Sequence, residues 1–430
     1  MSLDRTNNDD WNWVKAKDFM VFNPRESVKK GTTVKNVPMD KIEPKTKEIS
    51  SYEVTEFKGG VKFRNGDTLM ARITPCLENG KISQVSILDY NEIGAGSTEF
   101  IVLREKEGIS DKDFIYYLSN SEFFKEPAIK SMVGSSGRQR VQRDVVENLD
   151  IYVPPLSTQK KIGKILSYFD DKISLNKKIN KNLFKLSQEL YKNWFVNFEY
   201  PISDYETYKS SGGKFKIEDG IEIPIGMSIA NLSDVCDCQN GYAFYKVGYD
   251  EQGLMVIDLG NISLEGNFIY TNADKQISKG KIPNENYIVK KDDLVMVMTD
   301  RKSTMDLLGK TAKIYEDKSF ALNQRIYRIR PLINVNYVYS FLNNPSTLNI
   351  LKSEALGSVQ KYVNTNHINN LKIVIPNETL MEKFSKIVDP IFLRMENNIF
   401  QIKKLEKLRD TLLPKLMSGE IDVSQINCDL

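Results

Sequence analysis

The side chains best suited to a chemical task lie in one short loop that is rich in glycine and arginine. Gly137 is followed by Arg138, Gln139 and Arg140, and Arg143 comes three residues later. A guanidinium can donate two hydrogen bonds to the edge of a guanine, and a glutamine amide can pair in a similar way with an adenine. Because three arginines within six residues are hard to bury in a core, the loop is a candidate contact with duplex DNA. The alternative is a solvated surface.

A second loop farther along the chain has a related composition. It carries Gln360, Lys361, Tyr362 and Asn364. This mixture of polar, basic and aromatic side chains also suits a nucleic-acid groove. Further candidates for DNA contacts are basic residues of other loops: Arg72, Lys81, Lys246, Arg301, Lys302 and Lys310. For each of these, an ordinary surface charge is an equal alternative.

No catalytic constellation accompanies these loops. The chain lacks a G-x-x-x-x-G-K-[ST] phosphate loop and an N-P-P-[FY] tetrapeptide of adenine methyltransferases. Its single histidine, His367, offers little basis for acid–base chemistry. Cys236 and Cys238 lack the further ligands of a structural zinc site, so we expect them to be buried side chains. We therefore predict no catalytic residue and no metal site in this chain.

The two candidate loops occupy equivalent places in an internal duplication. NLDIYVPP at 148–155 returns 222 residues later as NLKIVIPN at 370–377, and NGDTLMARI at 65–73 resembles KDDLVMVMT at 291–299. In each copy, segments that alternate apolar and polar residues precede a long helical pattern. The sequence therefore predicts an α+β fold with two β-rich domains, each followed by one long helix.

The two helical patterns share the periodicity of a coiled coil. Residues 157–195 and 378–413 carry apolar side chains at alternating steps of four and three. An isolated helix with one apolar stripe is unstable in water, so we predict that the two helices pair antiparallel with pseudo-two-fold symmetry. Asn176 and Asn398 occupy the same position of this seam, and we predict that they meet near the pseudo-two-fold axis and set the helix register. The alternative is that both face solvent.

These patterns give the expected boundaries of the chain. They are 1–155 for the first domain, 156–196 for its helix, 197–220 for a linker, 221–376 for the second domain, 377–417 for its helix and 418–430 for a tail.

Composition is compatible with this organisation. Of the 430 residues, 40% are hydrophobic and 27% charged, as in ordinary globular proteins, and the formal net charge is +3. A charge this small permits nucleic-acid binding without arguing for it. The chain has neither a secretory signal nor a membrane-spanning run, so we expect a cytoplasmic protein without a membrane partner.

Several segments resemble one protein family. VPPLSTQKKIGKILSYFDDKI at 153–173 is similar to the central conserved region of type I restriction specificity subunits, and LRDTLLPKLMSGEI at 408–421 is similar to the end of their C-terminal conserved region. GDTLMARITPCLENGK at 66–81 and GSTEFIVLR at 96–104 resemble one class of their target recognition domains. NGYAFYKVGYDEQGLMVIDLGNI at 240–262 resembles another class.

The resemblance implies the non-catalytic, DNA-binding subunit of a type I restriction–modification system. It implies double-stranded DNA as the ligand, and two methyltransferase subunits and two restriction subunits as partners. S-adenosylmethionine, ATP and Mg²⁺ are then expected on those partners, with no cofactor bound by this chain. Two dissimilar recognition domains imply an asymmetric bipartite target, where partner subunits methylate adenine at N6 or cleave DNA with ATP.

Two other functions stay open at this point. A metal-dependent nuclease is one alternative, since Asp300 precedes Glu316-Asp317-Lys318 in a loose match to such sites. A pure scaffold that docks proteins is the other.

Overall fold

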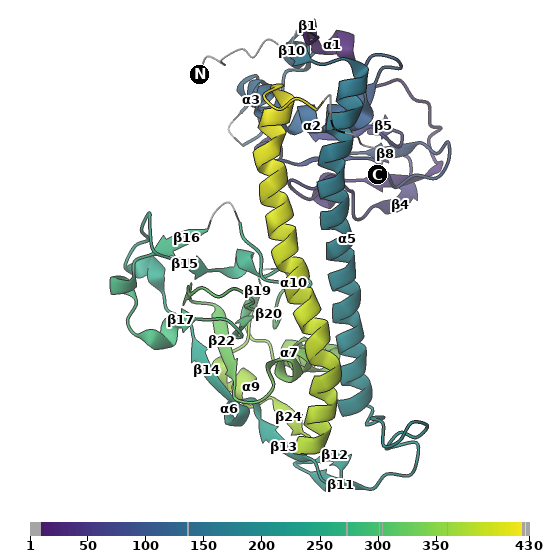
Figure 1. Ribbon diagram of the computed structural model, residues 1–430. Coiled ribbons are helices and arrows are strands. Elements are labelled where there is room, and N and C mark those ends of the chain that lie inside the picture. The colour runs from purple at the N-terminus through teal and green to yellow at the C-terminus, as the bar shows by residue number, and fades with distance from the viewer. Residues whose placement is uncertain are drawn as a thin grey trace. The chain divides into compact units, whose positions relative to one another are not determined.

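The computed structural model describes residues 10–135, 137–271, 274–300, 302, 304–358, 360–423 and 426. It divides into two compact units (Figure 1). Unit 1 contains residues 1–178 and 399–430, and unit 2 contains residues 179–398. Both long helices are divided between the units, so each unit combines one β-rich domain with half of each helix.

The domain of unit 1 is formed by short strands and helices. They are β1 (Asn12–Lys15), α1 (Ala16–Phe19), β2 (Met20–Phe22), β3 (Thr33–Val37), η1 (Met39–Lys41), β4 (Glu53–Glu56), β5 (Val61–Phe63), β6 (Thr68–Ala71), β7 (Ile82–Gln84), β8 (Gly94–Gly96), β9 (Phe100–Glu105), α2 (Lys112–Asn120), α3 (Glu122–Lys130), α4 (Arg143–Glu147) and β10 (Asp150–Val153). The strands form the sheets β2-β9-β6-β7 and β4-β3-β8-β5, and β1 pairs with β10.

The domain of unit 2 repeats this plan after an additional hairpin. Its elements are β11 (Phe215–Glu218), β12 (Ile221–Pro224), β13 (Ser228–Asn231), α6 (Leu232–Val235), β14 (Cys236–Asn240), η2 (Phe244–Lys246), β15 (Leu254–Ile257), η3 (Leu259–Asn261), β16 (Lys275–Ile277), η4 (Lys279–Lys281), η5 (Glu285–Tyr287), β17 (Ile288–Val289), β18 (Leu294–Val297), β19 (Thr299–Asp300), β20 (Thr311–Lys313), β21 (Phe320–Leu322), β22 (Ile326–Pro331), α7 (Val335–Asn343), α8 (Pro345–Ser353), β23 (Lys361–Tyr362), α9 (Thr365–Asn369) and β24 (Lys372–Ile375).

The sheet topology confirms the duplication. Unit 2 has the sheets β14-β22-β18-β20 and β16-β15-β21-β17, and β13 pairs with β24. The corresponding sheets of unit 1 have the same strand order. Each unit also has one parallel pair at the same place, β3 with β8 in unit 1 and β15 with β21 in unit 2. β9 and β22 are buried on both faces over their first four residues, which explains the apolar run FIVL of β9. In β22 the buried residues include Arg328.

The helices α5 (Leu156–Phe195) and α10 (Glu378–Met417) run antiparallel in both units, as predicted. In unit 1, Asp170 of α5 accepts a hydrogen bond from Arg409 of α10 at 2.5 Å. In unit 2, Trp194 at the end of α5 contacts Phe384 near the start of α10, with ring centroids 5.6 Å apart. Early residues of each helix therefore face late residues of the other.

The two asparagines of the seam are buried rather than solvent-facing. Asn176 donates from Nδ2 to Gln401 Oε1 at 2.7 Å within unit 1, and Asn398 donates from Nδ2 to Asn180 Oδ1 at 2.8 Å within unit 2. Each asparagine thus has a polar partner on the opposite helix, and in these hydrogen bonds that partner is Gln401 or Asn180 and not, as predicted, the other asparagine of the seam. Such a partner is what a register-setting side chain needs in an apolar seam.

The expected linker at 197–220 is a folded segment of unit 2. Tyr200 stacks on Tyr208 with centroids 4.8 Å apart, and Phe215 begins a strand of the β11–β12 hairpin. Lys372 of β24 pairs with Asp219 at 2.6 Å. The polar composition suggested a linker, but these aromatic contacts hold the segment against the domain.

Among the described residues, no helix has the length and apolar character needed to cross a bilayer.

Candidate nucleic-acid interface

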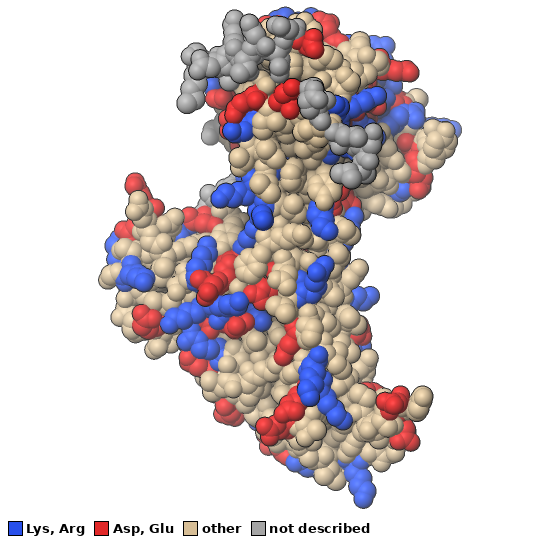
Figure 2. Space-filling view, in the orientation of Figure 1, with Lys and Arg blue, Asp and Glu red and all other residues tan. Residues whose placement is uncertain are grey.

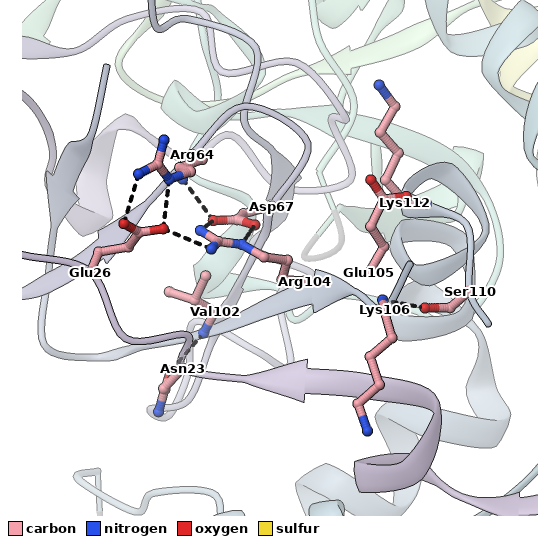
Figure 3. A network of polar contacts seen from close by, with 10 residues as sticks. All are labelled: Asn23, Glu26, Arg64, Asp67, Val102, Arg104, Glu105, Lys106, Ser110 and Lys112. Carbon is pink, nitrogen blue, oxygen red and sulfur yellow. Dashed lines mark hydrogen bonds and ion pairs between the residues drawn. The ribbon is translucent and has the colours of Figure 1, made fainter. Parts of the chain in front are cut away.

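A network of charged side chains joins the strands that lead to the candidate interface of unit 1 (Figure 3). Asp67 is buried directly before β6, and Arg104 of β9 donates from Nε to its Oδ1 at 2.7 Å and from Nη2 to its Oδ2 at 2.7 Å. The backbone N–H of Arg64 donates to the same carboxylate at 2.7 Å. We call the Asp67–Arg104 pair the unit 1 clamp. Its bidentate geometry fixes β6 against β9.

Glu26 extends this clamp with a second carboxylate. It accepts hydrogen bonds from Arg64 Nε at 2.6 Å and from Arg104 Nη1 at 2.7 Å. These two bonds, that of Arg64 first, outweigh the effect of burial and lower the pKa of Glu26 from 4.5 to about 2. Glu26 is therefore charged at neutral pH.

The same clamp recurs in unit 2. Asp293 is buried directly before β18, and Arg330 of β22 donates to Oδ1 and Oδ2 at 2.6 and 2.8 Å. The backbone N–H of Lys290 donates to the carboxylate at 2.8 Å. Each residue of this unit 2 clamp stands 226 positions after its counterpart in unit 1.

At the other ends of the clamped strands of unit 1, three chain segments meet. The N–H of Arg72, directly after β6, donates to the carbonyl of Glu99, directly before β9, at 2.9 Å. Val141 N–H donates to Arg72 O at 2.8 Å, and Thr74 N–H donates to Gln139 O at 3.0 Å. We call this meeting of residues 72–74, 97–99 and 138–141 the unit 1 junction. It contains the arginine-rich loop.

Unit 2 forms the same meeting of segments. Met298 N–H donates to Arg325 O at 3.0 Å, and Val363 N–H donates to Met298 O at 3.0 Å. β19 and β23 pair antiparallel beside them. The unit 2 junction consists of residues 298–300, 302, 323–325 and 360–363 and contains most of the second candidate loop. The duplication therefore places the two predicted loops at equivalent positions.

The arginines of the first loop have different environments. Arg140 donates from Nε and Nη2 to the carboxylate of Glu99, at 2.9 and 2.6 Å, and this hydrogen bonding lowers the pKa of Glu99. Arg143 pairs with Glu147 at 2.6 Å across one turn of α4. Arg138 is exposed, and its guanidinium forms no hydrogen bond or ion pair with the described residues. Arg138 is therefore the arginine of this loop that is most available to a ligand.

Three other candidates of unit 1 are held by the protein. Lys81 donates from Nζ to Met39 O at 2.8 Å, so this lysine fastens a loop. Arg72 is partly buried and donates from Nη2 to Val141 O at 3.4 Å. Gln139 is also partly buried. Their side chains are less available than sequence alone suggested.

In unit 2, the candidates divide in the same way. Asn364 accepts a hydrogen bond from His367 N–H at 3.0 Å and caps α9, which is a structural task. Gln360 and Lys361 are partly buried, whereas Tyr362 is exposed. The junction thus presents mainly a tyrosine and a lysine from this loop.

Four further candidates of unit 2 come from other segments. Lys302 and Lys246 are exposed, and Lys302 belongs to the junction. Lys310 is partly buried, and burial lowers its pKa. Arg301 lies outside the described residues.

The residues proposed for a nuclease have other roles. Asp300 accepts hydrogen bonds from the N–H groups of Lys302 and Leu307, both at 2.8 Å, so it orders a loop. Glu316 accepts one from the hydroxyl of Tyr270. Across the part of the chain that is described, no group of three or more His, Cys, Asp or Glu side chains is arranged to hold a metal ion.

Sequence reasoning missed two junction residues, Glu99 and Arg325. They are equivalent, because each precedes the strand that carries the clamp arginine, and they stand 226 positions apart. The sequence could have indicated them through the alignment of GSTEF at 96–100 with LNQRI at 322–326. This alignment has an offset of 226 and is lost when the two copies are aligned at the offset of 222.

Comparison with known proteins identifies a related family. The family model described as the type I restriction modification DNA specificity domain matches residues 8–185 and again residues 224–407. A specificity subunit of the type I restriction enzyme MjaIX from Methanocaldococcus jannaschii is 28% identical over 335 residues, which cover 75% of this chain and 71% of that protein. The HindI specificity subunit from Haemophilus influenzae is 26% identical over 438 residues, with 87% and 90% covered.

A solved structure has a similar fold. The crystal structure of the type I restriction–modification system S subunit from M. genitalium matches with a TM-score of 0.54 and 16% identity. The match covers 97% of this chain and 98% of that one. At this identity the likeness concerns the fold alone.

Proposed function

Because the chain belongs to the family of type I restriction modification DNA specificity domains, we propose that each of its units reads one half of a bipartite DNA target. The unit 1 and unit 2 junctions are the reading surfaces in this proposal. The phosphate backbone supplies affinity, and side chains at the junctions supply contacts to base edges.

One observation carries this proposal. The same clamp and the same backbone contacts recur in both units, but the junctions carry different side chains. Arg140 and Glu99 of unit 1 are replaced by Tyr362 and Arg325 at the equivalent positions of unit 2. A constant framework with different contact residues supports two different half-sites, and hence an asymmetric target.

The proposal assigns catalysis to partner subunits. Two methyltransferase subunits and two restriction subunits would use S-adenosylmethionine, ATP and Mg²⁺, and this chain would bind none of these. Its setting would be the cytoplasm, where bacterial and archaeal DNA lies.

The long helices are the proposed docking surface for the methyltransferase. Tyr168 and Leu175 of α5 stand seven residues apart, so they share one face of the helix in unit 1. Their exposed fractions are 66% and 48%. Large apolar side chains exposed in a row on a helix favour burial against a protein partner.

Mapping of N6-methyladenine in host DNA tests the proposed function. We expect methylation at two short words separated by a constant spacer of about five to eight base pairs, as two grips one helical turn apart require. Deletion of this chain should abolish that methylation. A contiguous target, or methylation that survives the deletion, would contradict the proposal.

A matched pair of variants locates the reading surface. Arg138→Ala removes the available guanidinium of the unit 1 junction, and Lys58→Ala removes an exposed lysine from a different loop of the same domain. We expect only Arg138→Ala to impair methylation while the subunits still assemble. Cleavage of plasmid DNA by the purified chain with Mg²⁺ alone would instead favour the nuclease alternative.

A further inference from the structure

We propose that Arg325 contacts DNA and determines specificity at the unit 2 junction. This inference rests on the proposed function, since it names a residue through which unit 2 would read its half-site. The sequence alone did not single out Arg325 as a candidate for DNA contact. It lies in a short turn between two buried strands, and such turns usually only connect the strands.

The turn that carries Arg325 is fixed by backbone contacts on two sides. Its carbonyl accepts the hydrogen bond from Met298 N–H at 3.0 Å. Gln324 N–H donates to Tyr242 O at 2.8 Å, and Tyr242 N–H donates to Leu322 O at 3.0 Å. The side chain at 325 is therefore presented from a rigid base, at the end of a strand that the unit 2 clamp holds.

Gly241 makes this close approach possible. A Cβ atom at position 241 would lie 1.8 Å from the carbonyl oxygen of Asn323, a distance that no side chain can adopt. The glycine belongs to the NGYAF segment at 240–244, whose purpose the sequence did not reveal. It allows the backbone of this segment to lie directly on the turn of Arg325.

Arg325 itself adopts a conformation that is unfavourable for most residues. Its φ angle is 77°, in the left-handed region that glycine and asparagine tolerate best. Non-glycine residues in this region carry a conformational cost and are frequent at functional sites. An arginine here therefore calls for an explanation other than backbone preference.

The guanidinium of Arg325 is exposed and uncompensated. Within the described residues it forms no ion pair and no hydrogen bond. Asp300, an acidic member of the junction, is buried, and its two oxygens accept the N–H groups of Lys302 and Leu307. Arg325 therefore keeps all of its donors for a ligand.

Unit 1 shows the opposite arrangement at the same place. Glu99, the counterpart of Arg325, holds Arg140 in a bidentate ion pair, and Arg140 is the counterpart of Tyr362. The charge of Arg140 is neutralised at that position of unit 1, whereas the charge of Arg325 is left open in unit 2. A guanidinium with free donors suits guanine O6 and N7 or a phosphate, and duplex DNA offers both.

The test uses the complete chain in complex with its methyltransferase. Arg325→Asn removes the guanidinium but keeps a residue that tolerates the left-handed backbone, and Arg325→Lys keeps the charge without the bidentate donors. Lys279→Ala, on η4 beside the other sheet, is the control. Dissociation constants are measured for duplexes with the mapped target and with each base pair of the unit 2 half-site replaced.

We expect Arg325→Asn to weaken binding of the mapped target by about 5- to 150-fold, and Lys279→Ala to leave it unchanged. If Arg325 reads a base, the loss disappears when one particular base pair is replaced, and Arg325→Lys behaves like Arg325→Asn. If it binds only a phosphate, the loss is equal on all duplexes, Arg325→Lys retains binding, and the salt slope falls by about one. That result would overturn the role of Arg325 in specificity.

Wild-type affinity and an unchanged methylation motif for a folded Arg325→Asn variant would overturn the inference. That outcome differs from failure of the proposed function, in which the wild-type complex itself would show no bipartite target. Circular dichroism checks folding, and Arg325→Gly serves as a second truncation if the asparagine variant is unstable.

Discussion

The two units of this chain differ at their junctions, the proposed reading surfaces, and agree in the clamps that support them. Asp67–Arg104 in unit 1 and Asp293–Arg330 in unit 2 make the same bidentate contacts on equivalent strands. At the other ends of those strands, a neutralised Glu99–Arg140 pair corresponds to an open Arg325 beside Tyr362. The clamps are alike because both domains need the same contact between strands to fold. The side chains of the junctions differ because the fold does not require particular residues there.

Removal of a clamp carboxylate should have the largest effect. Asp67→Ala leaves Arg104 with Glu26 as its remaining carboxylate partner, and Asp293→Ala leaves Arg330, whose side chain is 35% exposed, without its bidentate partner. Because both guanidiniums keep some access to solvent, we expect each change to lower the free energy of unfolding by about 3 kcal/mol, the low end for breaking a buried pair. Chemical denaturation followed by tryptophan fluorescence and circular dichroism measures this loss.

The two clamp variants also serve as controls for each other. Equal losses would support one shared structural role. A loss below about 1 kcal/mol in either unit, as for a surface pair, would show that the clamp of that unit is dispensable.

The helical seam offers a second contrast. In unit 1, buried Asp170 accepts hydrogen bonds from Arg409 at 2.5 Å and from the hydroxyl of Tyr117 at 2.6 Å. The equivalents of Asp170 and Arg409 in unit 2 are Phe392 and Ser187, which are also buried. One unit thus uses an ion pair where the other has an aromatic ring and a small hydroxyl.

Exchange of these residue types tests whether the seams are interchangeable. Arg409→Ser alone leaves a buried carboxylate unpaired and should cost about 3 kcal/mol of unfolding free energy. Adding Asp170→Phe should recover part of this loss, with a coupling energy of up to about 3 kcal/mol in a double-mutant cycle. Additive losses in denaturation experiments would mean that the surroundings of unit 1 do not accept the seam of unit 2.

The repeat and the helices were predictable because their signals are local. Steps of four and three residues reveal a helix seam without knowledge of the partner, and similar segments such as 148–155 and 370–377 reveal a duplication. The antiparallel pairing then follows from the apolar stripes. The hairpin at 215–224 escaped prediction, since Tyr200 and Tyr208 anchor it through a contact that polar composition hides.

The junctions were only partly predictable because their contacts are distant in sequence. The arginine-rich loop was identified from composition, but the pairing of Arg140 with Glu99 joins residues 41 positions apart. Whether an arginine is free or neutralised depends on such partners, and no local pattern gives them. Arg325 was missed for the same reason, since the segment of Gly241, which lies against the turn of Arg325, is distant in sequence.

The clamps should differ in their response to acid. Only the unit 1 clamp includes Glu26, whose pKa is lowered to about 2 by the two guanidiniums. A carboxylate with a lowered pKa stabilises the folded state above its ordinary pKa, and this stabilisation is lost as the pH falls from about 4.5 towards 2. Glu26→Gln should therefore flatten the pH dependence of the unfolding free energy in that window by up to about one proton.

Denaturation at a series of pH values measures this slope. Glu285→Gln, on an exposed 3-10 helix of unit 2, provides the comparison and should leave the slope unchanged. Identical slopes for wild type and Glu26→Gln would mean that the network of unit 1 does not hold Glu26 charged in acid.

The smallest expected effect comes from opening the neutralised junction. Glu99→Gln removes the carboxylate that holds Arg140, so unit 1 would present this guanidinium in addition to that of Arg138. We expect DNA affinity to rise by less than about tenfold, because one exposed charge contributes at most about 1 kcal/mol, and the salt slope to rise by about one. Glu147→Gln, which frees Arg143 on α4, separates this local effect from a change in net charge.

Weaker binding by Glu99→Gln would reverse the interpretation, since it would mean that Glu99 itself accepts a hydrogen bond from a base such as cytosine. The pair would then be a reading element in which Arg140 positions the carboxylate, and the two junctions would differ in the sign of the charge they offer to DNA.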